Sequence, residues 1–364
     1  MIATRPRQLG EGARSLRTAL AAVSWFATAT TTVVAQTAPV VSNVRASQRA
    51  DASRMVDIYY DLSHDAPCTV WPVISGDGGA TWNVPALTLT GDVGHNVAPG
   101  TNKHIVWDAG RDIPGVAATM RARVYADAGG TLSNMVFVPA GSFPYQRGTT
   151  WVFVNSFFVD KYEVINLRYA EFLNDADPDG TYWNSNMEIT RSGPPPNVYY
   201  AVIPGRENYP IRFVSVLEAE GYAVWISARE GQHFRLPTEQ EWEKAAAWDP
   251  TLNKHWLYAF QSDSFTCSSC NCAAGTACPQ NVTEVGRYNG LIGTNDAHSL
   301  YGCYDMSGNL WERTSGDGSS YPFRGGSWGT TSNSSSCQTT SRGSTSFLEH
   351  RSSTVGFRLV LDPN

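Results

Sequence analysis

The chain has 364 residues, of which 12% are aromatic and only 16% charged, and its 32 glycines and 20 prolines favour strand- and loop-rich domains over helical bundles. A single hydrophobic core stops growing at roughly 250–300 residues, so this length favours two domains. The formal net charge of -6, with no cluster of lysine and arginine after the N-terminal segment, argues against binding to nucleic acid, and we expect no such partner.

The N-terminal segment has the pattern of a secretory signal peptide. An arginine-rich start is followed from Thr18 by an almost uncharged run, and Val33 and Ala35 have the spacing of a small-residue cleavage site. We expect residues 1–35 to be removed and the mature protein to be exported to the periplasm, the cell surface or the medium. The alternative is an uncleaved anchor, although the run is short and rich in threonine; after cleavage we expect no transmembrane span.

Short alternating runs dominate residues 38–127. Segments such as MVDIYYDLS, CTVWPVIS and MRARVYAD are separated by Gly, Asp, Asn and Pro, which is typical of an antiparallel β-sandwich. The strand pattern resembles immunoglobulin-like or fibronectin-III-like modules. We interpret Asp77 in SGDGG as part of a hairpin turn rather than of a calcium loop. The small, polar segment AGGTLSN then marks a domain boundary.

The second domain, residues 134–363, contains three segments with a helical pattern. NLRYAEFLNDA and SVLEAEGYAVWISARE carry apolar residues at helical spacing. TEQEWEKAAAW begins with Thr238, and Glu241 follows three residues later, as in a capping box. The remainder is rich in Gly, Ser and Trp and has little periodicity. We therefore expect an α+β domain with long loops.

Several motifs of this domain occur together in a fixed order. They are FFVDKYEVIN, RLPTEQEWEKAA, YDMSGNLWE, RGGSW and GFRLV. This combination resembles the formylglycine-generating enzyme family, also called the sulfatase-modifying factor family. The resemblance covers about residues 134–363 and implies a variant of the C-type lectin fold. The full expectation is an all-β sandwich followed by an α+β, loop-rich, C-type-lectin-like domain.

The segment YDMSGNLWE also has the composition of a cation-binding loop. Asp305 and Glu312 supply hard carboxylate oxygens, and Gly308 allows a sharp turn that presents main-chain carbonyl groups. The resemblance implies a structural calcium ion, whose ligands match four positions: Asp305, Gly308, Leu310 and Glu312. The alternative is that the two carboxylates only form caps or salt bridges.

Other positions that match the family are interpreted as architectural. Glu163 and Asn166 resemble a buried polar pair near the start of the domain. A second calcium site of the family, near Asn271, lacks an expected aspartate, so we expect one calcium ion. Helix capping and surface solvation account for three further glutamates: Glu239, Glu241 and Glu243.

Seven cysteines in an exported protein favour disulfide bonds. Four of them lie in CSSCNCAAGTAC, which is either a thiolate metal site or a loop held by disulfides. We favour disulfides, with Cys303 or Cys337 as possible further partners, because the spacing matches no trusted zinc pattern. The odd total leaves at least one thiol unpaired, and Cys68 is the natural candidate because it belongs to the first domain.

The catalytic signature of the family is not matched. Its oxidases hold copper(I) with two cysteines that follow the RGGS-aromatic motif, and the corresponding positions here are about Thr330 and Ser335. Counting back from Arg342, which resembles a family arginine, shifts both positions by one residue and recovers no cysteine. We do not expect copper, and only Cys337, Ser335 and Arg342 remain as weak catalytic candidates. The chain has seven histidines but no close pair, so an iron site is the less favoured alternative.

These observations predict an exported, calcium-stabilised binding or surface-structural module. Its ligand would be a peptide or a carbohydrate, and three aromatic residues are candidates for lining the cleft: Trp311, Trp328 and Tyr321. The alternative is an oxidase of the formylglycine-generating type, or a related metal enzyme, that acts on a peptide cysteine or a small thiol with oxygen.

Overall fold

A computed structural model describes residues 39–363, apart from short gaps at 80–81, 83, 115–119, 128–133, 196, 273–277, 292 and 330–333. Residues 38–364 form one compact unit. The expected signal peptide and most of the expected domain boundary lie outside the described residues, and the division into residues 38–127 and 134–363 stays a prediction. None of the described helices is long and apolar enough to cross a membrane.

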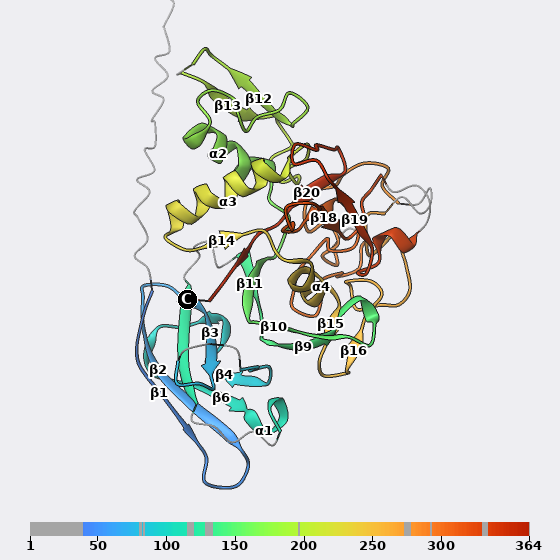
Figure 1. Ribbon diagram of the computed structural model, residues 1–364. Coiled ribbons are helices and arrows are strands. Elements are labelled where there is room, and N and C mark those ends of the chain that lie inside the picture. Colours follow the sequence, from blue (N-terminus) through green and yellow to red (C-terminus); the bar gives the residue numbers. More distant parts are fainter. Residues whose placement is uncertain are drawn as a thin grey trace, which may run out of the picture. The chain divides into compact units, whose positions relative to one another are not determined.

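The first seven strands form two antiparallel sheets (Figure 1). One has the order β1 (Val40–Gln48), β2 (Met55–Ser63), β6 (Gly100–Asp108), β4 (Leu89–Gly91), and the other the order β5 (Gly94–Val97), β3 (Cys68–Ser75), β7 (Arg121–Asp127). In β2 every second residue from Ile58 to Leu62 is fully buried, as the period of a strand requires. These side chains share one core with Val70 of β3 and Val124 of β7, so the two sheets face each other as a sandwich. A single helical turn, α1 (Ala109–Asp112), follows β6.

The second part of the chain contains the three helices that the sequence predicts: α2 (Asn166–Ala176), α3 (Val216–Glu230) and α4 (Glu239–Ala247). Thr238 caps α4, because its hydroxyl oxygen accepts from the Glu241 amide at 3.1 Å while the Glu241 carboxylate accepts from the Thr238 amide at 2.8 Å. This confirms the predicted capping box. Ser215 and Glu218 form a second one at the start of α3.

Two small four-stranded sheets lie among the long loops of this part. The first has the order β14 (Phe234–Arg235), β21 (Val360–Leu361), β11 (Phe157–Asp160), β8 (Met135–Val138), and the second the order β19 (Arg342–Thr345), β18 (Tyr321–Arg324), β17 (Trp311–Arg313), β20 (Val355–Phe357). Three two-stranded ladders complete it: β9 (Gly141–Pro144) with β10 (Trp151–Val154), β12 (Ile189–Ser192) with β13 (Tyr199–Val202), and β15 (Trp248–Asp249) with β16 (Lys254–His255). This loop-rich α+β arrangement agrees with the predicted fold class.

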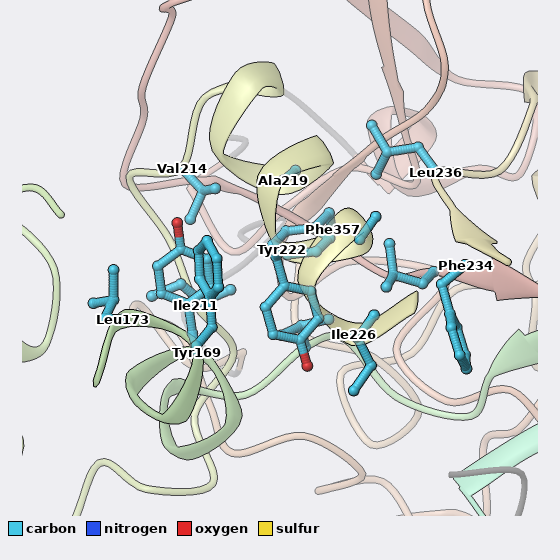
Figure 2. Packing of buried hydrophobic residues seen from close by; sticks show 14 of the residues in the cluster. Tyr169, Leu173, Ile211, Val214, Ala219, Tyr222, Ile226, Phe234, Leu236 and Phe357 are labelled. Carbon is cyan, nitrogen blue, oxygen red and sulfur yellow. The ribbon is translucent and has the colours of Figure 1, made fainter. Parts of the chain in front are cut away.

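Aromatic side chains join the helices to the sheets. Tyr169 of α2 stacks on Tyr222 of α3 with ring centroids 5.9 Å apart, and Phe357 of β20 meets both rings edge-on. Figure 2 shows these rings within a cluster that extends to Ile226 and Phe234. The first and last strands of the domain, β8 and β21, both pair with β11, so the core closes only when the two ends of the domain meet.

Candidate functional site

Three of the sequence motifs meet at one buried ion pair. Arg358 of GFR donates to both carboxylate oxygens of Glu312 of GNLWE, at 2.5 and 2.7 Å. The indole nitrogen of Trp242, from QEWEK, donates to the same carboxylate at 2.7 Å. All three side chains are fully buried. A buried ion pair contributes to the fold when its hydrogen bonds are satisfied, so these motif residues are structural.

Glu163 fixes the turn that carries the predicted calcium ligands. Its carboxylate accepts from the Asn309 side-chain amide at 2.7 Å and from the Leu310 backbone amide at 3.1 Å. Gly308 has a φ of +94°, and a Cβ atom there would lie 2.3 Å from the Asn271 carbonyl oxygen, so only glycine fits. The architectural interpretation of Glu163 agrees with these contacts.

Asn166 does not pair with Glu163. Its side-chain amide donates to the carboxylate of Glu188 at 3.2 Å and to the backbone oxygen of Arg206 at 2.9 Å. The two residues that the sequence suggests as a pair therefore fix two different segments.

The four predicted calcium positions lie on one turn, but their two carboxylates are bound to different partners. One oxygen of Asp305 accepts from the Gly286 amide at 2.6 Å, whereas both oxygens of Glu312 bind Arg358. Within the described parts of the chain, no three His, Cys, Asp or Glu side chains are grouped to hold a metal ion. A calcium ion would fit this donor set only if Glu312 left Arg358, and calcium stays a prediction.

The same region is rich in buried negative charge. Burial, and to a smaller extent the charge of Glu312, raises the pKa of Asp305 to about 6. Burial, followed by the charges of Asp305 and Glu312, raises the pKa of Glu163 well above its usual range, while Arg358 acts against this. The guanidinium of Arg358 thus faces the carboxylates of Glu163, Asp305 and Glu312. A proton or another cation would reduce this excess of negative charge.

The cysteines form disulfides and not a thiolate metal site. Cys267 pairs with Cys278, and Cys272 pairs with Cys337 across 65 residues. The remaining cysteines, Cys68, Cys270 and Cys303, are buried free thiols. The preference for disulfides, the role of Cys337 as a partner and the unpaired state of Cys68 are confirmed, whereas Cys303 as a partner is wrong.

The weak catalytic candidates lie around this disulfide. Cys337 is fully buried at the end of a 3-10 turn, Ser334–Cys337, and the Ser335 carbonyl oxygen accepts from the Ser341 hydroxyl group at 2.6 Å. Arg342 is largely exposed and forms an ion pair with Glu239 at 2.8 Å. Thr330 lies outside the described residues. No reactive pair is built from the three candidates.

A second buried ion pair lies next to the loop that carries Cys337, and the sequence analysis did not predict it. Arg324 of RGGSW binds the carboxylate of Glu243 and donates to the Thr339 carbonyl oxygen at 2.8 Å. His255 contacts the same carboxylate at 3.0 Å. Glu243 is fully buried, so its assignment to capping and surface solvation is wrong. The available signal was Arg324 itself. This charged residue precedes two glycines in a stretch without a nearby acidic residue, which indicates a carboxylate partner far away in the sequence.

The three aromatic candidates for the ligand cleft have different contacts. The Trp311 ring meets Phe323 edge-on at 5.4 Å between centroids, and the Tyr321 hydroxyl group donates to the Gly318 carbonyl oxygen at 3.3 Å. The indole nitrogen of Trp328 is buried and has no hydrogen-bond partner among the described residues. All three rings are half-buried, which leaves part of each accessible.

Comparison with known proteins decides the family. Residues 121–363 match the family described as "Sulfatase-modifying factor enzyme 1-like domain". The chain belongs to this family. The match begins in strand β7, before the start of the domain predicted at residue 134.

Curated relatives of this chain include a hercynine oxygenase and a formylglycine-generating enzyme. The chain is 29% identical over 219 residues to a hercynine oxygenase of Mycolicibacterium smegmatis, covering 51% of this chain and 46% of that protein. It is 27% identical over 228 residues to a formylglycine-generating enzyme of Thermomonospora curvata, covering 49% of this chain and 70% of that protein. The chain thus spans less than half the length of the hercynine oxygenase. Among solved structures, CarF has a TM-score of 0.49 at 20% identity and covers 64% of this chain and 98% of that chain.

Proposed function

We propose that this sulfatase-modifying factor domain binds a ligand and does not oxidise thiols with copper. The observation that carries the proposal is the buried disulfide between Cys272 and Cys337. A linear copper(I) site needs two soft thiolate ligands. Cys337 is the only cysteine of the loop after RGGSW, and its sulfur is already bonded.

The buried networks support a role for the family motifs in folding. Arg358 and Trp242 both donate to Glu312, and Arg324 binds Glu243 next to the loop of Cys337. Buried residues bound to each other in this way can hold the fold without touching a substrate. The scaffold can therefore persist where the paired thiols are absent.

The ligand of this domain would be a peptide or a carbohydrate that stacks on the accessible faces of Trp311 and Tyr321. We also propose that the mature protein is exported, which agrees with its two disulfides, and that calcium binds the Asp305 turn in competition with Arg358. The imbalance of buried charge around Glu163 supports a cation there.

An oxidase is the second candidate. It is supported by the names of the relatives and by the cluster in which Cys270 packs against the Cys272–Cys337 disulfide. Reduction of this disulfide would leave three thiols close together. An oxidase function therefore requires that the protein becomes active only after the Cys272–Cys337 disulfide is reduced.

Oxygen uptake separates the two candidates. The mature protein, with copper(I) and a cysteine-containing peptide, should consume oxygen no faster than copper and peptide alone, before and after mild reduction. Uptake by the wild-type protein, before or after reduction, that is lost in Cys337→Ser would contradict the proposal. Glycan and peptide arrays test the binding role: hits that disappear with Trp311→Ala support it, and hits that persist, or none at all, count against it.

A further inference from the structure

A cavity of about 300 Å³ lies beside strand β11 and helix α3, and apart from Glu163 its lining residues belong to none of the candidate sites above. Its apolar wall includes Ile226, Phe234 and Leu359, and Asp160 and Tyr222 are among the polar side chains that line it. Small-molecule pockets combine a mostly apolar wall with a few polar groups, and this volume is at the lower end of their range.

The polar groups of the cavity have unused hydrogen-bonding capacity. One carboxylate oxygen of Asp160 accepts from the Leu359 amide at 2.8 Å, while the other has no partner within the described parts of the chain. The Tyr222 side chain is only 5% exposed, and its hydroxyl group has no hydrogen bond to any described residue. Figure 2 shows this hydroxyl group on the side of Ile226, another residue of the cavity wall. A hydroxyl group that is free to form a further hydrogen bond beside a mostly apolar wall is a suitable polar contact for a small ligand.

Asp160 and Tyr222 interact electrostatically. Burial raises the pKa of Tyr222, and the negative charge of Asp160 is the next contribution. Both side chains also line the same cavity, so their free oxygens are available as acceptors beside its apolar wall.

The other charged groups of the cavity are already engaged. Arg168 lines it and forms an ion pair with Glu171 at 2.9 Å, although its charge also acts to lower the pKa of Asp160. Glu163 also lines the cavity, but its carboxylate accepts from Asn309 and Leu310. The free oxygen of Asp160 is thus the charged acceptor left for a ligand.

We propose that this cavity binds a small organic ammonium ion, with the free oxygen of Asp160 and the Tyr222 hydroxyl group as acceptors for its N–H groups. A hydrogen bond between an ammonium and a carboxylate is about twice as strong as a neutral one, which favours a cation over a neutral ligand of the same shape. The short apolar substituent of the ligand would pack against Ile226, Phe234 and Leu359. This inference does not depend on whether the domain oxidises thiols.

Calorimetric titration of the mature protein with 3-methylbutylammonium chloride at pH 8 tests the proposal. Asp160, with a pKa of about 7, is then mostly ionised, and alkylamines remain protonated. The neutral control is 3-methyl-1-butanol, which has the same apolar group. We expect the ammonium ion to bind at least about tenfold more tightly than the alcohol.

Variants then assign the contacts. Asp160→Asn should weaken ammonium binding about tenfold or more and leave binding of the alcohol unchanged, and Tyr222→Phe should weaken it severalfold. The matched control, Asp179→Asn, alters an exposed aspartate outside the cavity and should change nothing. If Asp160→Asn does not fold, Ile226→Phe narrows the cavity with the carboxylate intact and should weaken both ligands. Equal affinity for ammonium and alcohol, or unchanged binding in the folded Asp160 or Ile226 variant, would overturn the proposal.

Discussion

At the scale of single residues, buried ion pairs explain the charged residues of the family motifs better than a catalytic role does. Glu312 and Arg358 are fully buried and bind each other, so neither is available to a substrate. From the sequence alone Glu312 was expected to bind calcium. Its partner could not be foreseen because Arg358 lies 46 positions later and reaches Glu312 only through the pairing of β17 with β20.

Replacing Glu312 by glutamine tests this pair. The change removes the charged bidentate partner of the buried Arg358 guanidinium, and we expect it to lower the free energy of unfolding by about 3–5 kcal/mol. Urea denaturation followed by tryptophan fluorescence measures the difference. The exposed Glu284→Gln variant is the control and should change stability by less than about 0.5 kcal/mol. A similarly small effect at Glu312 would rule out the ion pair as a structural element.

The calcium proposal is tested at Asp305, which is buried beside this pair but does not bind Arg358 directly. Calcium should raise the melting temperature of the native protein and chelator should lower it, since a ligand that binds only the folded state stabilises it. In Asp305→Asn both effects should vanish. Melting curves that do not respond to calcium or chelator in the native protein would exclude the site.

The carboxyl group of Asp160 predicts a pH dependence of stability. Burial raises its pKa from 3.8 to about 7, so the folded state holds the proton more tightly than the unfolded state does. Its contribution is complete below about pH 4 and is lost as pH rises to about 7. Between these limits the native protein should lose about 3–4 kcal/mol more than Asp160→Asn. Parallel stability curves for the two proteins would contradict this assignment.

At the scale of elements, local signals in the sequence were sufficient for the helices. Thr238 and Glu241 are three residues apart, so their capping box could be recognised without knowledge of the fold. Glu243, on the same helix, was misassigned because its partner Arg324 is 81 residues away. Elements defined by neighbours in the sequence are predictable, whereas contacts between distant loops are not.

The two capping boxes should contribute similarly to stability. Ser215→Ala and Thr238→Ala each remove a hydroxyl group that accepts from a backbone amide at the start of a helix, and each should cost about 1 kcal/mol. Ser264→Ala, at an exposed loop position, is the control and should be close to neutral. Chemical denaturation gives the three values. If a cap variant is as stable as the loop control, the corresponding box does not form in solution.

At the scale of the whole molecule, the sequence predicted the order of a strand-rich and a loop-rich part and the family of the second. It did not predict which cysteines pair, because connectivity depends on how loops are placed in three dimensions. The bond between Cys272 and Cys337 joins the cysteine-rich segment to the loop after RGGSW. The proposal that this domain does not oxidise thiols with copper rests mainly on this bond.

Disulfide mapping tests that claim most directly. The purified mature protein is alkylated under denaturing, non-reducing conditions, digested with trypsin and examined by mass spectrometry. Cleavage after Lys254, Arg287, Arg324 and Arg342 isolates Cys337 in the peptide of residues 325–342. The account predicts that this peptide is recovered linked to the peptide of residues 255–287, which contains Cys272. Recovery of residues 325–342 as a single peptide with Cys337 alkylated would contradict it.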